Sequence, residues 1–138
     1  MENTNIGYLL HHVSSVLDRH SDQVLMERYG IGFSQFKILM VLLESEGKTQ
    51  NQVASKLGQT EASISRQVKI MKEKKLITIE QTKNNKRSKH IFLTNKGDAL
   101  TKKSLQTLND YHSPMFESLN EKERASLLKI LVDLKNYL

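Results

Sequence analysis

At 138 residues the chain is long enough for one domain with a modest core, and the lack of cysteine excludes disulfides, thiolate metal sites and thiol redox sensing. No apolar stretch approaches the ~20 residues of a membrane span, and the polar N-terminal residues do not resemble a secretion signal, so we expect a cytoplasmic protein without a membrane partner. The formal net charge is +6, and all of it lies in residues 60–90, which contain nine basic and three acidic side chains. Such a concentrated basic segment is typical of a protein that binds a polyanion, although a solvated lysine-rich surface would give the same pattern.

The N-terminal third of the sequence predicts two helices. Apolar residues recur at helical spacing over residues 6–29, and the glycines in residues 30–32 end this first helix. Ser34 is expected to cap a second helix over about residues 35–45, because its hydroxyl can accept a hydrogen bond from a free backbone N–H. This second helix is apolar on almost every side, which places it at the centre of the core.

Two shorter helices are expected next, with a glycine between them. A capping box at Thr49 predicts a helix that ends at Leu57. Thr60 is expected to cap another helix, which runs to about Lys74. In a helix-turn-helix a small residue lets the two helices approach, a glycine permits a left-handed turn, and a branched apolar residue locks the second helix against the first. Here these residues are Ala54, Gly58 and Ile64.

After these helices the apolar period changes from 3.6 to 2. Residues 77–82 alternate apolar with polar side chains, residues 91–93 form a second β-rich run, and residues 83–87 are a polar turn with three cations. Since an isolated hairpin is marginal in water, this one is expected to pack against the helices. The order of helix, glycine turn, helix and hairpin is that of a winged helix-turn-helix. We therefore predict a mainly α fold with a small β-hairpin wing (α+β), in which residues 34–94 form the DNA-binding lobe.

Two more helices complete the predicted fold. Thr94 can cap a long helix from about Asn95, and Pro114 predicts a kink or break in it. Asn120 and Glu123 have capping-box spacing, which predicts the start of a final, leucine-rich helix.

The predicted DNA contacts begin with the helix that follows Thr60, whose N-terminal part would enter the major groove. There Ser63, Ser65 and Arg66 are placed to reach base edges, and an arginine can bind guanine O6 and N7 bidentately. The side chains better suited to phosphates are Thr60, Lys69 and Lys72 on this helix, and Gln50 and Asn51 on the preceding one.

The expected wing adds a second set of contacts. Its polar tip contains Lys83, Asn85, Lys86 and Arg87. The last two can reach along the duplex into the neighbouring minor groove, where arginine is favoured by the narrow geometry of A·T-rich DNA.

Two segments resemble the MarR family of bacterial transcriptional regulators, and the resemblance covers nearly the whole chain. Residues 84–97 look like the family's wing signature, a charged tip followed by a strand that ends in Leu-Thr-x-x-Gly. Residues 63–68 resemble the core of its recognition helix. By this resemblance Arg87 matches the arginine that enters the minor groove, and Ser65 and Arg66 match groove-facing positions.

The resemblance also implies an assembly and a ligand. Family members are homodimers whose terminal helices intertwine, which assigns residues 6–29 and 95–138 of a single 1–138 domain to dimerisation. The resemblance implies a repressor that binds double-stranded DNA at a pseudo-palindromic operator and is released by a small aromatic or anionic effector. The effector pocket would be lined by His11, His12 or His20.

Two residues depart from the family pattern. The family usually has an aspartate in place of Asn85, where the carboxylate braces a wing arginine, and a glycine in place of Lys75, after the recognition helix. If Lys75 has a left-handed backbone, the lysine costs about 1 kcal/mol.

Other functions find less support in the sequence. The histidines show no HExxH motif or i,i+4 pair, and there is no Gly-rich phosphate loop or nucleophile elbow, so we expect no metal, no cofactor and no enzyme activity. Two alternatives stay open. One is a non-specific nucleoid-type DNA binder, and the other is a winged-helix module that binds a protein partner.

Overall fold

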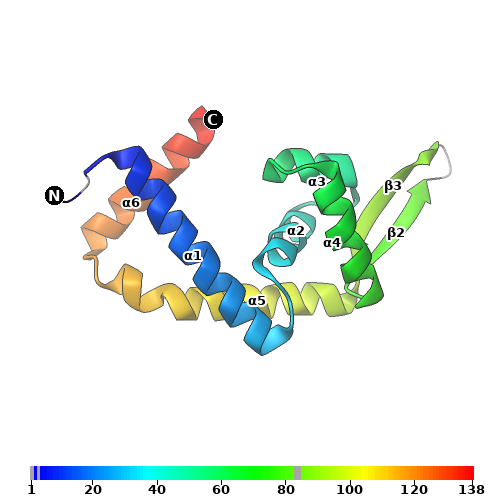
Figure 1. Ribbon diagram of the computed structural model, residues 1–138, viewed down its shortest axis with the longest axis horizontal. Coiled ribbons are helices and arrows are strands. Elements are labelled where there is room, and N and C mark those ends of the chain that lie inside the picture. The colour runs from blue at the N-terminus through cyan, green and yellow to red at the C-terminus, as the bar shows by residue number, and fades with distance from the viewer. Residues whose placement is uncertain (1, 3, 83–84) are drawn as a thin grey trace. The chain divides into compact units, whose positions relative to one another are not determined.

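Helices account for most of the fold, and a small antiparallel sheet is the rest of its regular structure. The computed structural model describes residues 2, 4–82 and 85–138, and for residues 82 and 85–87 it describes the backbone only. In this part of the chain the elements are α1 (Ile6–Tyr29), α2 (Phe33–Glu44), β1 (Lys48–Thr49), α3 (Gln50–Leu57), α4 (Glu61–Glu73), β2 (Ile77–Thr82), β3 (Asn85–Leu93), α5 (Asn95–Glu117) and α6 (Glu121–Tyr137) (Figure 1). The predicted fold class, mainly α with a small β wing, is confirmed.

The chain divides into two compact units, and the boundary falls inside α5. Residues 1–105 form the first unit, which holds the four N-terminal helices, the sheet and the start of α5. Residues 106–138 form the second unit, which holds the rest of α5 and α6. The predicted division of the chain into a DNA-binding lobe and dimerisation helices concerns the assembly, and it stays a prediction.

The core of the first unit is built around α2, as the sequence predicts. This helix contacts α1, α3, α4 and β3, and its Ile38, Leu39 and Leu42 side chains are fully buried. Each such side chain stabilises the fold by about 1.5–3 kcal/mol relative to an exposed one. The buried apolar residues that α1, α4 and β3 contribute to the core include Leu25, Ile64, Val68, Met71 and Ile91.

The N-terminus of α2 is capped from another helix. The predicted cap at Ser34 is wrong, because α2 begins at Phe33 and its N-cap residue, Gly32, makes no side-chain cap. Instead the Phe33 backbone N–H donates to Asp22 Oδ1 of α1 at 2.9 Å. The capping contact therefore spans two helices, and a search for a cap among the adjacent residues cannot find it.

The sheet has three strands in the order β1-β3-β2. β1 is too short to show a period in the sequence and was not predicted; its Lys48 lies opposite Ile91 of β3. β3 begins at Asn85, so the prediction that Asn85, Lys86 and Arg87 belong to the hairpin turn is wrong for these three residues. Pairing with β2 overrides the low strand propensity of asparagine. Lys83 lies outside the described residues.

The predicted starts of α3, α4 and α6 are confirmed. Thr49 and Gln52 form a capping box at α3, and Asn120 and Glu123 form one at α6. Thr60 caps α4, where its hydroxyl accepts from the Ser63 backbone N–H at 3.2 Å. These caps join residues three apart in the sequence, so a local pattern is sufficient to predict them.

The long helix α5 does not break at Pro114. It continues to Glu117, and the Pro114 carbonyl accepts from the Ser118 backbone N–H at 3.2 Å. Proline removes its own N–H bond to the preceding turn and its ring crowds the carbonyl four residues before it, which can kink a helix without ending it. The prediction of a break there is therefore wrong.

Candidate nucleic-acid interface

The helix-turn-helix predicted from three residues is present. Ala54 is 4% exposed and Ile64 is fully buried, so the small residue and the branched residue both lie in the packed interior, and α3 contacts α4. Gly58 ends α3 with φ of 63°. A side chain at Gly58 would meet no atom within 4 Å, so the left-handed backbone is the reason for glycine at this turn.

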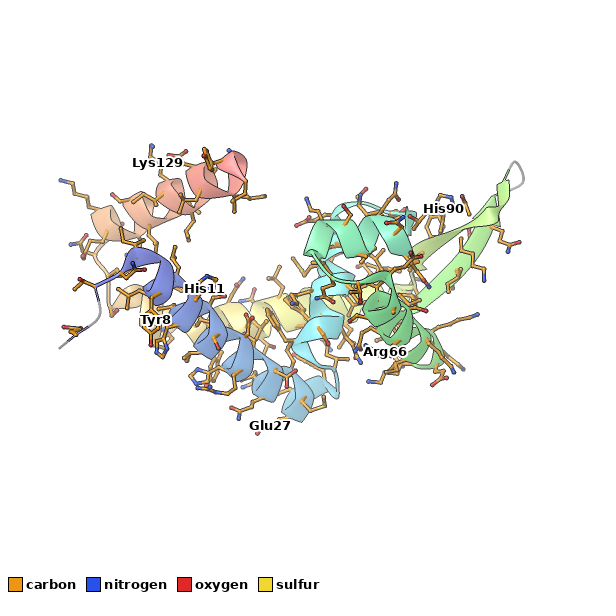
Figure 2. The ribbon with its side chains drawn as sticks, turned by 45° about the horizontal axis from the view of Figure 1, so that its top comes forward. Tyr8, His11, Glu27, Arg66, His90 and Lys129 are labelled. Atoms are coloured by element: carbon orange, nitrogen blue, oxygen red, sulfur yellow. The ribbon has the colours of Figure 1, made fainter. Side chains whose placement is uncertain are left out.

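The helix α4 presents a polar face to solvent. Ile64, Val68 and Met71 are buried, whereas the exposed residues of the predicted contact set are Ser65, Arg66, Lys69 and Lys72. Arg66 is one of the side chains that project from the surface of α4 (Figure 2). The structure therefore leaves these four side chains available to a large partner.

Two predicted residues at the start of α4 make hydrogen bonds within the protein. The Thr60 hydroxyl is the cap of the helix. Ser63 is half-buried, and its hydroxyl donates to Gln59 Oε1 at 3.5 Å. Their first role is therefore to shape the turn before α4.

A polar pocket of about 480 Å³ brings separate segments of the chain together. Three of the residues predicted to contact DNA, Gln50, Asn51 and Ser65, line it from α3 and α4. The residues that line the pocket and were not predicted are Thr49, Glu61, Ser88 and Lys89. The start of α3, the start of α4 and the strand β3 thus share one polar surface.

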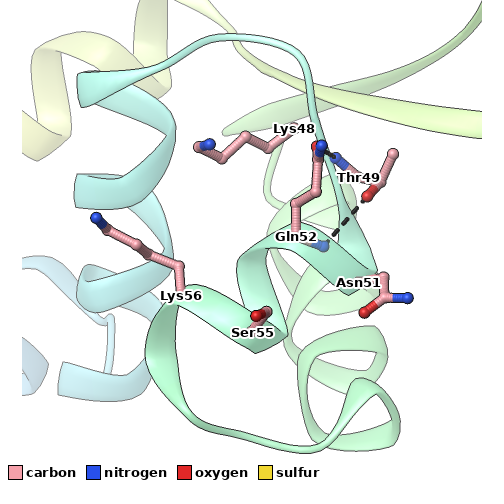
Figure 3. Close-up of a pocket in the computed structure, with 6 residues that line it drawn as sticks. All are labelled: Lys48, Thr49, Asn51, Gln52, Ser55 and Lys56. Atoms are coloured by element: carbon pink, nitrogen blue, oxygen red, sulfur yellow. Dashed lines mark hydrogen bonds between the residues drawn. The ribbon is translucent and has the colours of Figure 1, made fainter. Parts of the chain in front are cut away.

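A second pocket, of about 510 Å³, lies against α3 and is lined in part by two lysine side chains. Lys48 and Lys56 extend to the same side of the helix, and Asn51 points the other way (Figure 3). The capping box between Thr49 and Gln52 fixes the backbone beside them, with hydrogen bonds of 2.9 and 3.2 Å. Both lysines lie outside the basic segment 60–90, so a count of charge along the sequence does not reveal them.

The base of the wing is braced by a histidine. His90 Nδ1 lies 2.6 Å from the Gly47 carbonyl oxygen. Because a carbonyl can only accept, Nδ1 carries the proton. The Gly47 backbone N–H also donates to the Ile91 carbonyl at 3.2 Å. The loop before β1 is therefore fastened to β3, while the side chains of Lys86 and Arg87 lie outside what the structure describes.

The histidines predicted to line an effector pocket lie on α1. His11 and His12 are exposed, His20 is half-buried, and the Tyr8 and His12 rings stack with centroids 6.3 Å apart. The two pockets described above are lined by other residues, and the effector pocket stays a prediction. In the described residues there is no group of three His, Asp or Glu side chains placed to hold a metal ion. None of the described helices combines the length and apolarity that crossing a bilayer requires.

Solved structures share this fold over almost the whole chain. A mutant of MarR from E. coli is 24% identical, with a TM-score of 0.85, and the match covers 97% of this chain and 98% of that one. The DNA complex of MepR from S. aureus is 25% identical, with a TM-score of 0.81, over 99% of this chain and 100% of that one. A Mycobacterium tuberculosis MarR family protein in complex with salicylic acid is 20% identical, with a TM-score of 0.79, over 96% of this chain and 98% of that one.

Sequence comparison gives a family. No curated protein matches the chain, but residues 29–88, which span α2 to β3, match the profile of the MarR family. Residues 29–88 therefore match the MarR family, and the solved structures show that almost the whole chain has the fold of these proteins. The resemblance inferred from the wing and the recognition helix is confirmed.

Lys75, which follows α4, occupies a left-handed position. Its φ is 61°, and among the described residues it is the one non-glycine residue with a positive φ. The Lys75 N–H donates to the Lys72 carbonyl and the Leu76 N–H to the Met71 carbonyl, both at 3.0 Å. This is the Schellman arrangement that usually takes glycine, so the strain expected for a lysine is present.

The Leu-Thr-x-x-Gly signature joins α5 to the end of α4. The Thr94 hydroxyl donates to the Lys75 carbonyl at 2.7 Å, and the Thr94 N–H donates to the Leu76 carbonyl at 3.0 Å. The same hydroxyl accepts from the Gly97 N–H at 3.0 Å. A Cβ at Gly97 would lie 2.0 Å from the Leu76 carbonyl oxygen, so only glycine lets the backbones approach this closely.

Proposed function

We propose that this chain is a transcriptional repressor that binds a pseudo-palindromic DNA site as a homodimer and is released by a small effector. The observation that carries the DNA-binding part is the polar surface shared by α3, α4 and β3, where Gln50, Asn51 and Ser65 line one pocket. On a sequence that folds as a winged helix, such a surface at the start of the recognition helix fits the major groove. The MepR structure solved as a DNA complex supports the same use of the fold.

The exposed face of α4 supplies the sequence-reading groups. We assign base contacts to Ser65 and Arg66, because they lie near the N-terminus of the recognition helix and are free of the core. Ser63 can join them only through a hydroxyl that is half-buried at the turn.

Phosphate contacts hold the helix in register without reading bases. We assign these contacts to Lys69 and Lys72 on α4, together with Thr60, Gln50 and Asn51. Lys48 on β1, Lys56 on α3 and Lys89 on β3 add positive charge to the same lobe. Lys83, Asn85, Lys86 and Arg87 of the wing are proposed to contact the adjacent groove.

Unpaired apolar surface supports a homodimer. α6 has no buried residue, although nearly half of its residues are apolar, and its Leu128 is 66% exposed. On α1, Ile6 is 76% exposed and Val13 is 47% exposed. Helices of this kind need a partner to cover them. We propose a second copy of the chain, since a two-fold axis would place two recognition helices about one turn of DNA apart.

The effector is proposed to be a small aromatic or anionic molecule. The support is the salicylic acid complex of the Mycobacterium tuberculosis relative and the imidazoles of His11, His12 and His20, which can donate to a carboxylate. Thermal shift measured against a set of small aromatic acids tests this, because a ligand that binds the folded state raises the melting temperature.

Fluorescence anisotropy tests the proposed DNA function. Promoter DNA from genes that flank this one and random DNA would be titrated across a salt series. The regulator predicts tighter binding to promoter DNA, and Arg66→Ala should narrow the difference. Equal affinity for both DNAs would leave a nucleoid-type binder, and no binding at low salt would favour a protein-binding module.

A further inference from the structure

An acidic side chain stands on the surface assigned to DNA. Glu61 is the first residue of α4 and is exposed. It lines the polar pocket together with Asn51, Ser65 and Lys89. Within the described residues Glu61 has no hydrogen bond or ion pair. The carboxylate is therefore available to a ligand in the pocket.

A carboxylate here is unfavourable for phosphate contacts. Phosphate oxygens carry negative charge and can only accept hydrogen bonds. The Glu61 carboxylate has the same properties, so the two groups repel at short range. The other side chains exposed on α4 beyond its first turn include Arg66, Lys69 and Lys72, which suit DNA. Favourable interaction between the helix dipole and an acid at the N-terminus offers an explanation without DNA, but it predicts an effect on stability alone.

The position of Glu61 favours a base contact. Ser65 is four residues further along and shares the same face of the helix, and both line the pocket. The N-terminal residues of a recognition helix are the ones that meet base edges. An ionised carboxylate can only accept, and the base-edge donor that suits it in the major groove is the N4 amino group of cytosine.

We propose that Glu61 is a specificity-determining residue that accepts a hydrogen bond from the N4 amino group of one cytosine in each half-site. This inference rests on the proposed function, because it requires sequence-specific binding through α4. The Glu61 carboxylate would also disfavour guanine and thymine at that position, because guanine O6 and thymine O4 are themselves acceptors.

In vitro selection from a randomised duplex pool tests the proposal with the full chain and three variants. Wild type should enrich cytosine at one position of each half-site, by roughly tenfold over the other bases. Glu61→Ala should remove the preference at that position alone. Glu61→Gln should move it toward adenine, whose N6 and N7 an amide can bind. Glu73→Gln is the matched control, since Glu73 is exposed at the other end of α4.

The outcomes separate this proposal from the function on which it rests. The proposal is wrong if Glu61→Ala keeps the wild-type base preference at every position. It is also wrong if the variant gains the same affinity for every sequence, because Glu61 would then act through charge or stability only. If the wild-type protein enriches no sequence, the proposed sequence-specific function is wrong, and the proposal for Glu61 is wrong as well. A change at one position that Glu73→Gln does not share supports base reading.

Discussion

The Asp22 carboxylate of α1 accepts a hydrogen bond from the Phe33 backbone N–H at the first turn of α2, at 2.9 Å. α2 is the helix around which the first unit packs. Its N-terminus would otherwise have no side-chain cap.

Asp22→Ala should therefore destabilise the fold by about 1 kcal/mol, the usual effect of losing a helix cap. Urea unfolding followed by circular dichroism measures this. Asp22→Asn keeps an acceptor oxygen and should retain most of the stability. Asp18→Ala, an exposed acid one turn earlier on α1, is the control and should change little. Equal losses for Asp18→Ala and Asp22→Ala would contradict a capping role.

Lys75→Gly should stabilise the protein. The left-handed φ of 61° strains a lysine but not a glycine, so we expect a gain of about 1 kcal/mol and a melting temperature higher by roughly 3–5 °C. Lys69→Gly, in the interior of α4, should have the opposite sign and lose about 0.5–1 kcal/mol. Thermal unfolding of both variants checks the two signs, and a destabilised Lys75→Gly would show that the lysine side chain has a role we have not identified.

Gly97→Ala should be among the most damaging single-methyl substitutions in the first unit. The added Cβ would lie 2.0 Å from the Leu76 carbonyl oxygen, so α5 and the end of α4 must separate. We expect a loss of about 1–3 kcal/mol, typical of overpacking. Gly7→Ala on exposed α1, where the nearest atom is a side-chain oxygen at 3.4 Å, is the control and should be neutral or stabilising. A Gly97→Ala protein of wild-type stability in chemical denaturation would contradict the close approach.

Lys48 and Lys56 provide a test of the phosphate contacts around α3. If each neutralises one phosphate, the double change to alanine should reduce the slope of log affinity against log salt by about 1.8. The loss of affinity should be similar for promoter and random DNA, because these contacts do not read bases. Lys103→Ala on α5, an exposed lysine outside the pockets described, should leave the slope unchanged. An unaltered slope in the double variant would remove both lysines from the interface.

The proposed dimer is tested on α6. Leu128 and Leu131 are 66% and 44% exposed, and changing both to glutamate should place charge in a dry interface. We expect analytical ultracentrifugation to show a shift from dimer to monomer at micromolar concentration. Lys129→Glu is the control, because Lys129 lies 77% exposed in a surface ion pair with Asp133 and such pairs contribute little. A wild-type chain that sediments as a monomer would refute the homodimer directly.

Local signals in the sequence were sufficient for much of this fold. The cap at Thr60 and the capping boxes at Thr49 and Asn120 join residues three apart. The turn at Gly58 depends on a single residue with a left-handed backbone, which glycine favours. The cap of α2 was missed because Asp22 lies eleven residues before Phe33. β1 was missed because two residues carry no period, and its pairing with Ile91 joins distant parts of the chain.

The part of the candidate site that lies on one helix could be predicted from local signals, and the part that depends on packing between segments could not. The outward face of α4 follows from helical period, so Ser65 and Arg66 could be placed on it. The contribution of Lys89 depends on how β3 packs beside α3 and α4, which no single segment encodes. Glu61 is one of the three acidic side chains in the basic segment 60–90, and only its place in the pocket gives it a role.

The joint between α4 and α5 is made almost entirely with main-chain acceptors. Thr94 and Lys96 bond to the carbonyl oxygens of residues 74–76 and to none of their side chains. Carbonyls are present whatever amino acid occupies those three positions. Mutation can therefore exchange the exposed side chain at position 75, where a lysine stands at a left-handed position that favours glycine, at the expense of some backbone strain and without breaking the hydrogen bonds between the two helices.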